Sequence, residues 1–531
     1  MRRQPQTGIS SLLFVRRLAN LTMFSAAKKL AQSDDPVMRS KVAIVDDTGS
    51  YTYAQLLDDA RKVRSALRGS ANKGTSIAML MPNGYEYAAV QWGIWAAGGA
   101  VVPLSPMHPE RELEYFITDS DARHVICHPT LQATLKPVLE KLGDTVQLIS
   151  SDEAMRTSET RNTKDTEIDE NQRALFIYTS GTTGKPKGVV HTHASISAQV
   201  GALHEAWKWS SRDRLLHMLP LHHIHGIVVA LYGALWAGAT AEMLPRFDAD
   251  RVMNRLIDGQ QDITIMMGVP TMYTRLLHVI NEMPVKRKRA ASLTVRRLRL
   301  TISGSAALPA SIFNRWEAAT GQKMLERYGM SEIGMALSNS AIDQASRAVG
   351  IVGKPLPNVS VRLVDADGTD VTDQPDKPGM IQVKGPNVFH EYYGLPEKTA
   401  KEFTSDGWFI TGDVGARNAD GFYYIMGRQS TDIIKSGGFK LSALEIEREL
   451  LEHVDIVDAA VVGIPSEEWG EVVAAALVLQ PGRSISINEL KPWCYERIAR
   501  YKTPKAIRIV ATLPRNLMGK LDKKAVKAMF L

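Results

Sequence analysis

The sequence predicts an α/β protein with a large N-terminal part and a small α+β part at its C-terminal end. Along most of the chain, short apolar segments alternate with longer segments whose apolar residues recur at helical spacing, which is typical of buried strands covered by helices. From Gly350 onward the pattern is rich in strands and turns, and near the end it changes to helix, strand, strand, helix and strand. With 531 residues, 44% of them hydrophobic, the chain can bury more than one core.

The first alternating stretch contains six predicted strands: Val42–Asp46, Ile77–Met81, Ala100–Leu104, Val125–Cys127, Val146–Ile149 and Ala174–Thr179. Ala100–Leu104, Val125–Cys127 and Val146–Ile149 are expected to be buried. Helical spacing of apolar residues predicts helices at Thr52–Leu67 and Tyr85–Ala97. The polar segment Ser150–Asn171 has few apolar residues and predicts a loop or linker.

The remaining predicted elements divide into three groups. Strands Arg214–Leu219, Thr264–Val269 and Arg299–Ile302 continue the alternation, and strands Val359–Val364, Gly379–Val383 and Gly421–Ile425 form the β-rich part. The last group is helix Ala443–Leu451, strands Asp455–Gly463 and Glu471–Leu479, helix Ile487–Arg500 and strand Ile507–Val510. A boundary near Gln429–Ile433 therefore predicts a large domain at 34–429 and a small one at 430–531.

Two apolar stretches, Ala88–Val102 and Ile227–Ala241, are shorter than the ~18 to 20 residues that a membrane-spanning helix needs. We expect both to be buried helices, and we expect no transmembrane segment.

Residues 1–33 carry six Lys or Arg side chains and no acidic one, so they account for six units of the formal net charge of +7. This arginine-bearing, acid-free composition predicts a mitochondrial transit peptide and a matrix protein. The alternative is a cytoplasmic protein in which this segment is an extension or a first helix. The rest of the chain is almost neutral, which argues against a nucleic-acid partner. The two cysteines, Cys127 and Cys494, fit a reducing compartment.

A glycine- and hydroxyl-rich segment, Tyr178–Gly188, directly follows a predicted strand. Its glycines allow close approach of backbone N–H groups to an anion, and its hydroxyl and lysine side chains add donors and positive charge. The residues with this chemistry are Thr179, Ser180, Gly181, Thr182, Thr183, Gly184, Lys185 and Lys187. The segment predicts a phosphate-binding loop, although Pro186 after Lys185 departs from the Walker P-loop pattern.

This loop resembles the phosphate-binding signature of the adenylate-forming superfamily, which includes acyl-CoA synthetases, luciferases and peptide-synthetase adenylation domains. Six further segments resemble the superfamily's signatures in the same order: Leu221–Gly226, Ser303–Ala307, Tyr328–Glu332, Thr411–Asp413, Gly427–Gly438 and Pro514–Lys520. The resemblance covers essentially the whole chain after residue 33 and implies the superfamily's fold, a large N-terminal domain with a small mobile C-terminal domain.

The resemblance implies a reaction in two halves. A carboxylate attacks the α-phosphate of ATP to give an acyl adenylate and pyrophosphate, and the thiol of CoA then displaces AMP to give a thioester. Glu332 matches a carboxylate that binds Mg²⁺, and Asp413 matches the residue that accepts the ribose hydroxyls. Arg428 matches a second ribose or phosphate contact. The residues that match the adenine walls and a phosphate contact are Gly304, Ser305, Ala306, Tyr328, Gly329 and Ser331.

Three C-terminal features match residues that act in turn in the superfamily. Lys520 matches the lysine that bridges the attacking carboxylate and the α-phosphate, and Thr183 and Glu332 complete the implied catalytic set. The segment Ser436, Gly437 and Gly438 matches the passage for CoA. Ser430 matches the hinge, where relatives often have Asp or Lys.

The acyl substrate is predicted from the histidine motif and from arginines. The histidines of Leu221–Gly226 have no accompanying zinc-type acid pattern, so we interpret His223 as part of a gate and pocket wall rather than as a metal ligand. Arg275 and Arg299 are the candidates for pairing with a second carboxylate. The motifs around these residues most resemble the malonyl-CoA synthetases within the superfamily.

Malonate, ATP and CoA are therefore the expected substrates of a malonate–CoA ligase. The alternatives are an acyl-CoA synthetase for methylmalonate, a medium-chain fatty acid or an aryl acid, and a non-catalytic AMP-binding protein. The joint presence of Glu332, Asp413, Arg428 and Lys520 favours an enzyme over the non-catalytic alternative.

Overall fold

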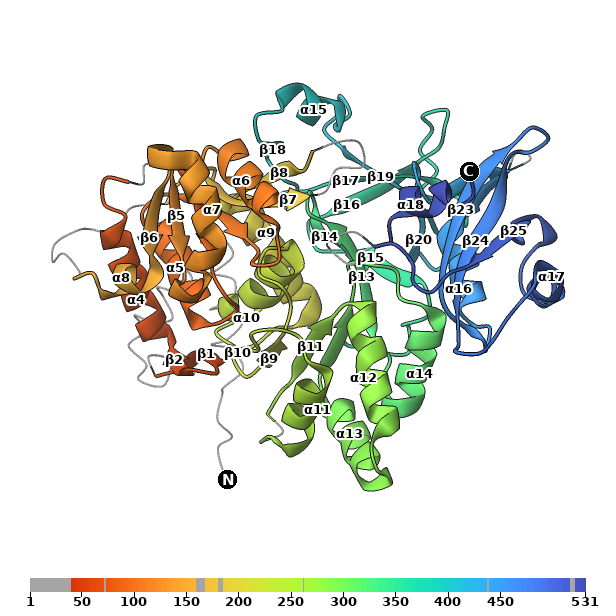
Figure 1. Ribbon diagram of the computed structural model, residues 1–531, viewed down its shortest axis with the longest axis horizontal. Helices are drawn as coiled ribbons and strands as arrows, with labels where there is room; N and C mark the ends of the chain where they lie inside the picture. Colours follow the sequence, from red (N-terminus) through yellow and green to blue (C-terminus); the bar gives the residue numbers. More distant parts are fainter. Residues whose placement is uncertain are drawn as a thin grey trace, which may run out of the picture.

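The computed structural model describes residues 40–70, 73–158, 168–179, 185–260, 262–436, 439–515 and 521–531. These residues form three sheets. Figure 1 shows the first sheet and its helices at the left of the molecule, the third sheet at the right, and β13, β14 and β15 between them.

The first sheet has seven strands in the order β18-β8-β7-β4-β3-β5-β6. Their bounds are β18 (Glu391–Tyr392), β8 (Lys187–Thr192), β7 (Arg173–Thr179), β4 (Ala100–Leu104), β3 (Ser76–Leu80), β5 (His124–Cys127) and β6 (Gln147–Ser150). The five strands from β7 to β6 are parallel, β8 runs antiparallel to β7, and β18 runs antiparallel to β8. Helices α4 (Tyr53–Ala66), α5 (Tyr85–Ala96), α6 (Glu110–Asp119) and α7 (Gln132–Leu142) belong to this part.

The second sheet runs through the middle of the molecule in the order β16-β17-β19-β20-β15-β14-β13-β12-β11-β9-β10-β1-β2. Its parallel strands are β1 (Val42–Asp46), β10 (Thr240–Met243), β9 (Arg214–His217), β11 (Ile265–Gly268), β12 (Leu300–Ser303) and β13 (Leu325–Met330). Its antiparallel strands are β2 (Gly49–Thr52), β14 (Gly334–Ser338), β15 (Ile351–Pro355), β16 (Ser360–Val364), β17 (Gly379–Lys384), β19 (Phe409–Arg417) and β20 (Tyr423–Arg428).

Two groups of helices cover the parallel half of the second sheet. One core contains apolar side chains of α4, α5, α9 (His193–Trp207) and the π-helix η3 (His225–Tyr232), together with strands of both large sheets. A separate core lies under α11 (Ala249–Asp258), α12 (Pro270–Glu282), α13 (Val285–Arg297) and α14 (Ala310–Thr320). Helix α5 buries eleven of its twelve residues, including Trp92 and Trp95, because it belongs to the core that the two sheets share.

The third sheet is built only from residues after Asp432. It contains β21 (Ile433–Ser436), β22 (Phe439–Ser442), β23 (Ile456–Ser466), β24 (Gly470–Leu479) and β25 (Ala506–Ile509). Two small cores flank it, one with α16 (Ala443–Leu450) and α17 (Ile487–Tyr495) and the other with α18 (Lys523–Ala528).

Several expectations from the sequence need correction. Part of the expected linker at 150–171 is helix α8 (Ser151–Arg156), which buries Ser151 and Ala154 and carries acidic residues in its first turn and an arginine in its last. Strand β6 is only partly buried because it is the edge of its sheet. The expected helix 487–500 ends at Tyr495.

The two apolar stretches are not single helices. Ala88–Val102 contains the end of α5, a turn with Gly98 at a positive φ of 88°, and strand β4. Ile227–Ala241 contains η3, the short helix α10 (Gly233–Trp236) and the start of β10. Among the described residues, no helix is both long enough and apolar enough to cross a membrane.

Candidate functional site

The candidate site lies where the first sheet meets the second. Strands β7 and β8 form an antiparallel pair in which Thr179 is opposite Lys187, so the glycine-rich segment is the connection of a hairpin. Ser180, Gly181, Thr182, Thr183 and Gly184 lie outside the described residues. The Lys185 ammonium is 5.4 Å from the centre of the Tyr115 ring, and the Tyr115 hydroxyl donates to the Pro186 carbonyl at 2.8 Å.

Adjacent antiparallel strands bring Asp413 and Arg428 together. Asp413 on β19 is directly opposite Arg428 on β20, and Arg428 Nε lies 2.9 Å from Asp413 Oδ1. The Tyr328 hydroxyl donates to Asp413 Oδ2 at 2.6 Å. An ionised carboxylate has about four acceptor positions, so Asp413 can accept further donors while it keeps both contacts. The two residues that we expected around a ribose, Asp413 and Arg428, therefore lie together with Tyr328, which we expected at the adenine.

Glu332 lies in the turn between β13 and β14, and its carboxylate is buried. The Tyr392 hydroxyl donates to Glu332 Oε1 at 2.9 Å, and the Phe389 N–H donates to the Glu332 carbonyl at 2.7 Å. Burial raises the pKa of Glu332, and the hydrogen bond from Tyr392 opposes this shift. Lys187 lies over the Tyr392 ring, at 4.2 Å from its centre.

Within the described part of the chain, no Lys or Arg nitrogen lies within 4 Å of the Glu332 carboxylate. A buried carboxylate without a cation is costly, and oxygen ligands of this kind suit a divalent ion such as Mg²⁺. The environment of Glu332 therefore fits the expected metal ligand.

The same turn is held from the first sheet by His191 on β8. Its Nε2 lies 2.7 Å from the Ser331 carbonyl, and its Nδ1 lies 3.1 Å from Ser195 Oγ. Burial lowers the pKa of His191 to about 4, so the ring is neutral at physiological pH. The neutral ring therefore fixes the backbone of Ser331 beside Glu332.

Two glycines allow close packing in the expected adenine-binding region. A Cβ on Gly329 would lie 1.9 Å from the Gly334 carbonyl oxygen, and a Cβ on Gly304 would lie 2.3 Å from Arg327 Cζ. The next residues, Ser305 and Ala306, are exposed at the end of β12, and Ser305 has a positive φ of 68°. These positions are consistent with a surface wall that a flat ring can reach.

Arg327 was not among the residues predicted from the sequence, although it directly precedes the Tyr328–Glu332 motif. Its side chain is buried behind Gly304, and its Nε and Nη2 have no hydrogen-bond partner among the described residues. Burial lowers its pKa to about 10, so it remains charged at neutral pH. Two adjacent charged residues, Glu326 and Arg327, in a short strand were the available signal.

His225 shares this buried region with Arg327. Its Nδ1 lies 3.1 Å from Ser305 Oγ, while its Nε2 is buried without a partner in the described chain. Burial, followed by the charge of Arg327, lowers its pKa well below the usual value. Ser303 Oγ, directly before Gly304, is also buried and unpartnered among the described residues. The region thus has several polar atoms that lack a protein partner.

The two arginines that we expected to bind a second carboxylate lie in different environments. Arg299 precedes β12, at the strand end opposite to Gly304, and its Nε and Nη2 bind the Asp213 carboxylate at 2.9 and 3.0 Å. Arg299 also donates to the Trp207 carbonyl at 2.6 Å. Arg275 is exposed on α12. Arg299 therefore belongs to a structural ion pair, and Arg275 is exposed to solvent.

Two histidines of the motif are in ring contact with each other, and one of them is in ring contact with His108. The rings of His222 and His223 are 4.0 Å apart, and the ring of His108 is 5.2 Å from that of His222. In the described residues, no set of three or more His, Cys, Asp or Glu side chains is arranged to hold a metal ion.

The C-terminal candidates are described only in part. Ser430 lies in the short turn between Arg428 and Asp432, in which the Asp432 N–H donates to the Arg428 carbonyl at 2.8 Å. Ser436 is buried at the end of β21. Gly437, Gly438 and Lys520 lie outside the described residues.

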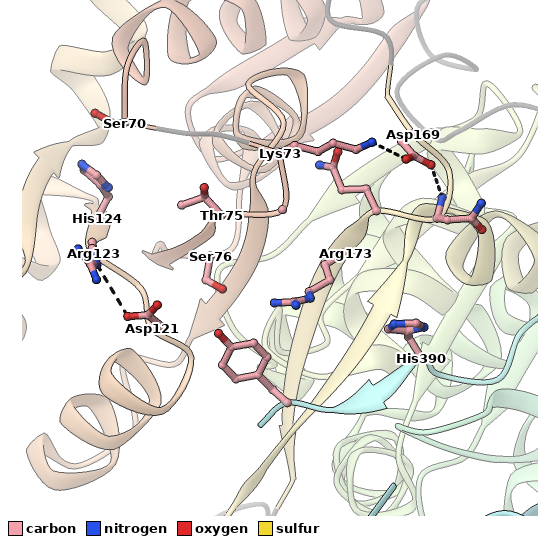
Figure 2. A pocket seen from close by; sticks show the side chains of 14 residues that line it. Ser70, Lys73, Thr75, Ser76, Asp121, Arg123, His124, Asp169, Arg173 and His390 are labelled. Carbon is pink, nitrogen blue, oxygen red and sulfur yellow. Dashed lines mark hydrogen bonds and ion pairs between the residues drawn. The ribbon is translucent and has the colours of Figure 1, made fainter. Parts of the chain in front are cut away.

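A polar pocket of about 710 Å³ lies away from these residues, at the opposite end of β7 (Figure 2). Its three Lys and Arg side chains are Lys73, Arg123 and Arg173, which pair with Asp169, Asp121 and Glu391 at 2.6, 3.8 and 3.4 Å. Because each cation already has a carboxylate partner, we do not include this pocket in the candidate site.

Two protein-family models and several known proteins match most of this chain. Residues 34–393 match the AMP-binding enzyme family, and residues 445–520 match the AMP-binding enzyme C-terminal domain. The mitochondrial malonate–CoA ligase ACSF3 of Mus musculus is 40% identical over 91% of this chain and 88% of its own length. The malonate–CoA ligase of Arabidopsis thaliana is 38% identical over 94% and 88%. ATP-bound MatB from Rhodopseudomonas palustris superposes with a TM-score of 0.84 at 35% identity, covering 96% of this chain and 99% of that one.

The placement of Arg299 leads to a stability prediction. Replacing Arg299 with Met leaves the buried Asp213 carboxylate without its cation, so we expect a loss of about 3 kcal/mol in the free energy of unfolding, measured with urea. The matched control Arg275→Met removes an exposed arginine and should change it by less than about 0.5 kcal/mol. Equal losses in the two variants would contradict this placement.

Proposed function

Because the chain belongs to the AMP-binding enzyme family and has the adenylate-forming fold, we propose that it is a malonate–CoA ligase. It forms a malonyl adenylate and pyrophosphate from malonate and ATP, and then malonyl-CoA and AMP from the adenylate and CoA. The similarity to two malonate–CoA ligases over most of the chain supports this assignment.

The assignment of a dicarboxylate as the substrate rests on the unpaired guanidinium of Arg327. A long-chain or aryl acid needs an apolar pocket, and against such a substrate Arg327 Nε and Nη2, His225 Nε2 and Ser303 Oγ would remain buried without a partner. A second carboxylate pairs with the guanidinium and accepts hydrogen bonds from neighbouring donors. We therefore assign the distal carboxylate of malonate to Arg327, in place of Arg275 or Arg299, with His225 rather than His223 beside it.

In this proposal, the nucleotide is held by charged groups on both sheets. Asp413 accepts the ribose hydroxyls while it remains paired with Arg428 and Tyr328. The Thr179–Lys187 segment surrounds the phosphates with N–H, hydroxyl and ammonium donors, and Thr183 is its catalytic member. Gly304, Ser305, Ala306 and Gly329 line the adenine, and Ser331 contacts a phosphate.

Glu332 would hold Mg²⁺, which supplies a positive charge that offsets the negative charge of the phosphates. Tyr392 keeps the carboxylate of Glu332 oriented by its hydrogen bond, and His191 holds the neighbouring backbone. Glu332, Tyr392 and His191 thus have a positioning role: they place the α-phosphate within reach of the malonate carboxylate before any bond is broken.

The C-terminal residues complete the proposal. The large domain comprises 34–429 and the small domain 430–531, with Ser430 as the hinge between them. Lys520 contacts the reacting carboxylate and α-phosphate in the first half reaction. Ser436, Gly437 and Gly438 line the path of the CoA thiol in the second.

We also propose that the protein acts in mitochondria. The acid-free segment 1–33 supports import into the matrix, and similar ligases are named as mitochondrial. A cytoplasmic location is the alternative.

Selectivity for the acid tests the proposed function. We expect AMP release in the presence of ATP and CoA to be much faster with malonate than with acetate, octanoate or coumarate, with methylmalonate as the closest competitor. Arg327→Met removes the partner of the distal carboxylate, so kcat/KM for malonate should fall on the order of 100-fold or more, while the KM for ATP changes little. Equal kcat/KM for malonate and acetate in the unmodified enzyme would refute the malonate assignment.

The role of Lys520 predicts a split between the half reactions. Lys520→Ala should reduce malonate-dependent ATP–pyrophosphate exchange on the order of 100-fold or more, because charge that develops at the α-phosphate loses its partner. Conversion of preformed malonyl adenylate and CoA to malonyl-CoA should persist. Exchange at the unmodified rate would show that Lys520 has another role.

The contact between Tyr392 and Glu332 predicts a change in metal requirement. Tyr392→Phe removes the hydrogen bond that orients the carboxylate, so the Mg²⁺ concentration for half-maximal rate should rise about 10-fold. Tyr393→Phe is the matched control, because the ring of Tyr393 packs on Arg173 instead. An identical Mg²⁺ dependence in both variants would be inconsistent with Glu332 as the ligand.

A further inference from the structure

Helix α13 carries a local excess of positive charge that the proposed function does not use. Six of its thirteen residues are Lys or Arg, and none is acidic. The segment 283–316, which includes this helix, contains no Asp or Glu. Because the chain after residue 33 is almost neutral as a whole, the charge of α13 is a local feature of the surface. Such a helix attracts an anionic partner.

The exposed side chains of α13 lie on one side of the helix. Successive residues of an α-helix are rotated by about 100°, so the exposed positions between 285 and 296 fall within half of the circumference. The other half buries Ala291 and Val295 in the core under α11, α12 and α14. The exposed half, the basic face, consists of Val285, Lys286, Lys288, Arg289, Leu293 and Arg296.

The cations of the basic face have no acidic partner in the described part of the chain. Arg287, which points to the other side of α13, is different, because its Nη2 lies 2.9 Å from Asp258 Oδ2. A paired guanidinium has little attraction left for a further anion, whereas an unpaired cation keeps its full charge. The side chains without a carboxylate within 4 Å are those of Lys286, Lys288, Arg289 and Arg296.

Two apolar side chains lie among these cations. Val285 is 83% exposed and Leu293 is 49% exposed. Val285 lies one turn before Arg289, and Leu293 lies one turn after it. An exposed aliphatic side chain is stabilised when it leaves water, which contact with phosphate groups alone does not achieve. The basic face therefore suits a partner that has anionic groups at its surface and an apolar layer beneath them.

We propose that the basic face of α13 binds the surface of a bilayer that contains anionic lipids. The four unpaired cations contact the headgroup phosphates, and Val285 and Leu293 enter the boundary between headgroups and acyl chains. Each Lys or Arg near an anionic leaflet strengthens binding about 5-fold. The helix lies along the bilayer and does not cross it, because its other half remains packed on the protein.

The position of α13 leaves the candidate site accessible in this arrangement. The helix ends at Arg297, just before β12 begins at Leu300, so its last turn lies toward the strand end opposite to Gly304. Figure 1 shows α13 at the lower edge of the molecule, whereas β7, β8 and β13 lie well above it. A bilayer bound to α13 therefore does not cover the residues that we assign to ATP and the acid.

The test measures co-sedimentation of the full-length chain with lipid vesicles. We expect binding to vesicles of phosphatidylcholine and phosphatidylglycerol in equal parts, weakened by added salt, and much weaker binding to phosphatidylcholine alone. In Lys286→Gln/Arg289→Gln, the partition coefficient for the anionic vesicles should fall about 25-fold, because two cations are lost. Equal binding to both kinds of vesicle, or unchanged partitioning of this variant, would overturn the inference.

Arg123→Gln/Lys136→Gln is the matched control, because it removes two equally charged side chains from the part of the chain around the first sheet. These side chains are 76% and 75% exposed. Partitioning should change by less than about 2-fold, since charges in salt solution act over only about 10 Å. The midpoint of urea unfolding should be unchanged in both double variants. Equal losses of vesicle binding would indicate attraction by net charge alone and would overturn the inference.

Val285→Ser/Leu293→Ser distinguishes a bilayer from a nucleic acid as the partner. The loss of two aliphatic side chains should weaken binding to the anionic vesicles on the order of 10-fold. Duplex DNA offers no apolar layer, so any binding of duplex DNA should be the same in this variant and in the unmodified chain. Unchanged vesicle binding in this variant, with duplex DNA binding that requires Lys286 and Arg289, would assign the basic face to nucleic acid and refute the proposal.

Residues 1–33 carry six further cations and are present in every variant. Their contribution to vesicle binding is therefore common to all the chains compared. If this segment alone caused the binding, the three double variants would partition as the unmodified chain does, and the basic face would have no role.

Discussion

A buried guanidinium without an acidic partner is the interaction on which the site depends. Arg327 lies behind Gly304, and its Nε and Nη2 bond to nothing in the described chain. Folding around such a group costs several kcal/mol unless a ligand pairs with it. The neighbouring Glu326 is not an ion-pair partner of Arg327, because successive side chains of a strand face opposite ways. Its Oε1 accepts the Leu308 N–H instead.

The charges around Arg327 are arranged in complementary fashion. Asp413 is already neutralised by Arg428, whereas Glu332 and Arg327 each lack an oppositely charged partner among the described residues. The Glu332 carboxylate is suited to bind a divalent cation, and the Arg327 guanidinium is suited to bind an anionic group of the acid. The site thus has separate positions for the metal that accompanies ATP and for the second charge of a dicarboxylate.

Sequence patterns predicted most of the fold and part of the site. Buried strands such as β3 and β4 are nearly continuous apolar runs and were therefore predictable. Asp413 and Arg428 were expected from motifs that resemble the superfamily's signatures, and the structure brings these two residues together. Helix α8 was missed because only two of its side chains are buried, which leaves almost no apolar periodicity. The ion pair of Arg299 was not predicted because its partner Asp213 is distant in sequence, and such pairing depends on tertiary structure. The same limit concealed Arg327, whose lack of a partner is visible only when its neighbours are placed.

The most direct measurement is a crystal structure of the enzyme with a non-hydrolysable analogue of malonyl adenylate. We expect the distal carboxylate to lie within about 3 Å of Arg327 Nε and Nη2, and the ribose hydroxyls to bind Asp413. A distal carboxylate directed to solvent, or paired with another residue while Arg327 stays without a ligand, would contradict the account.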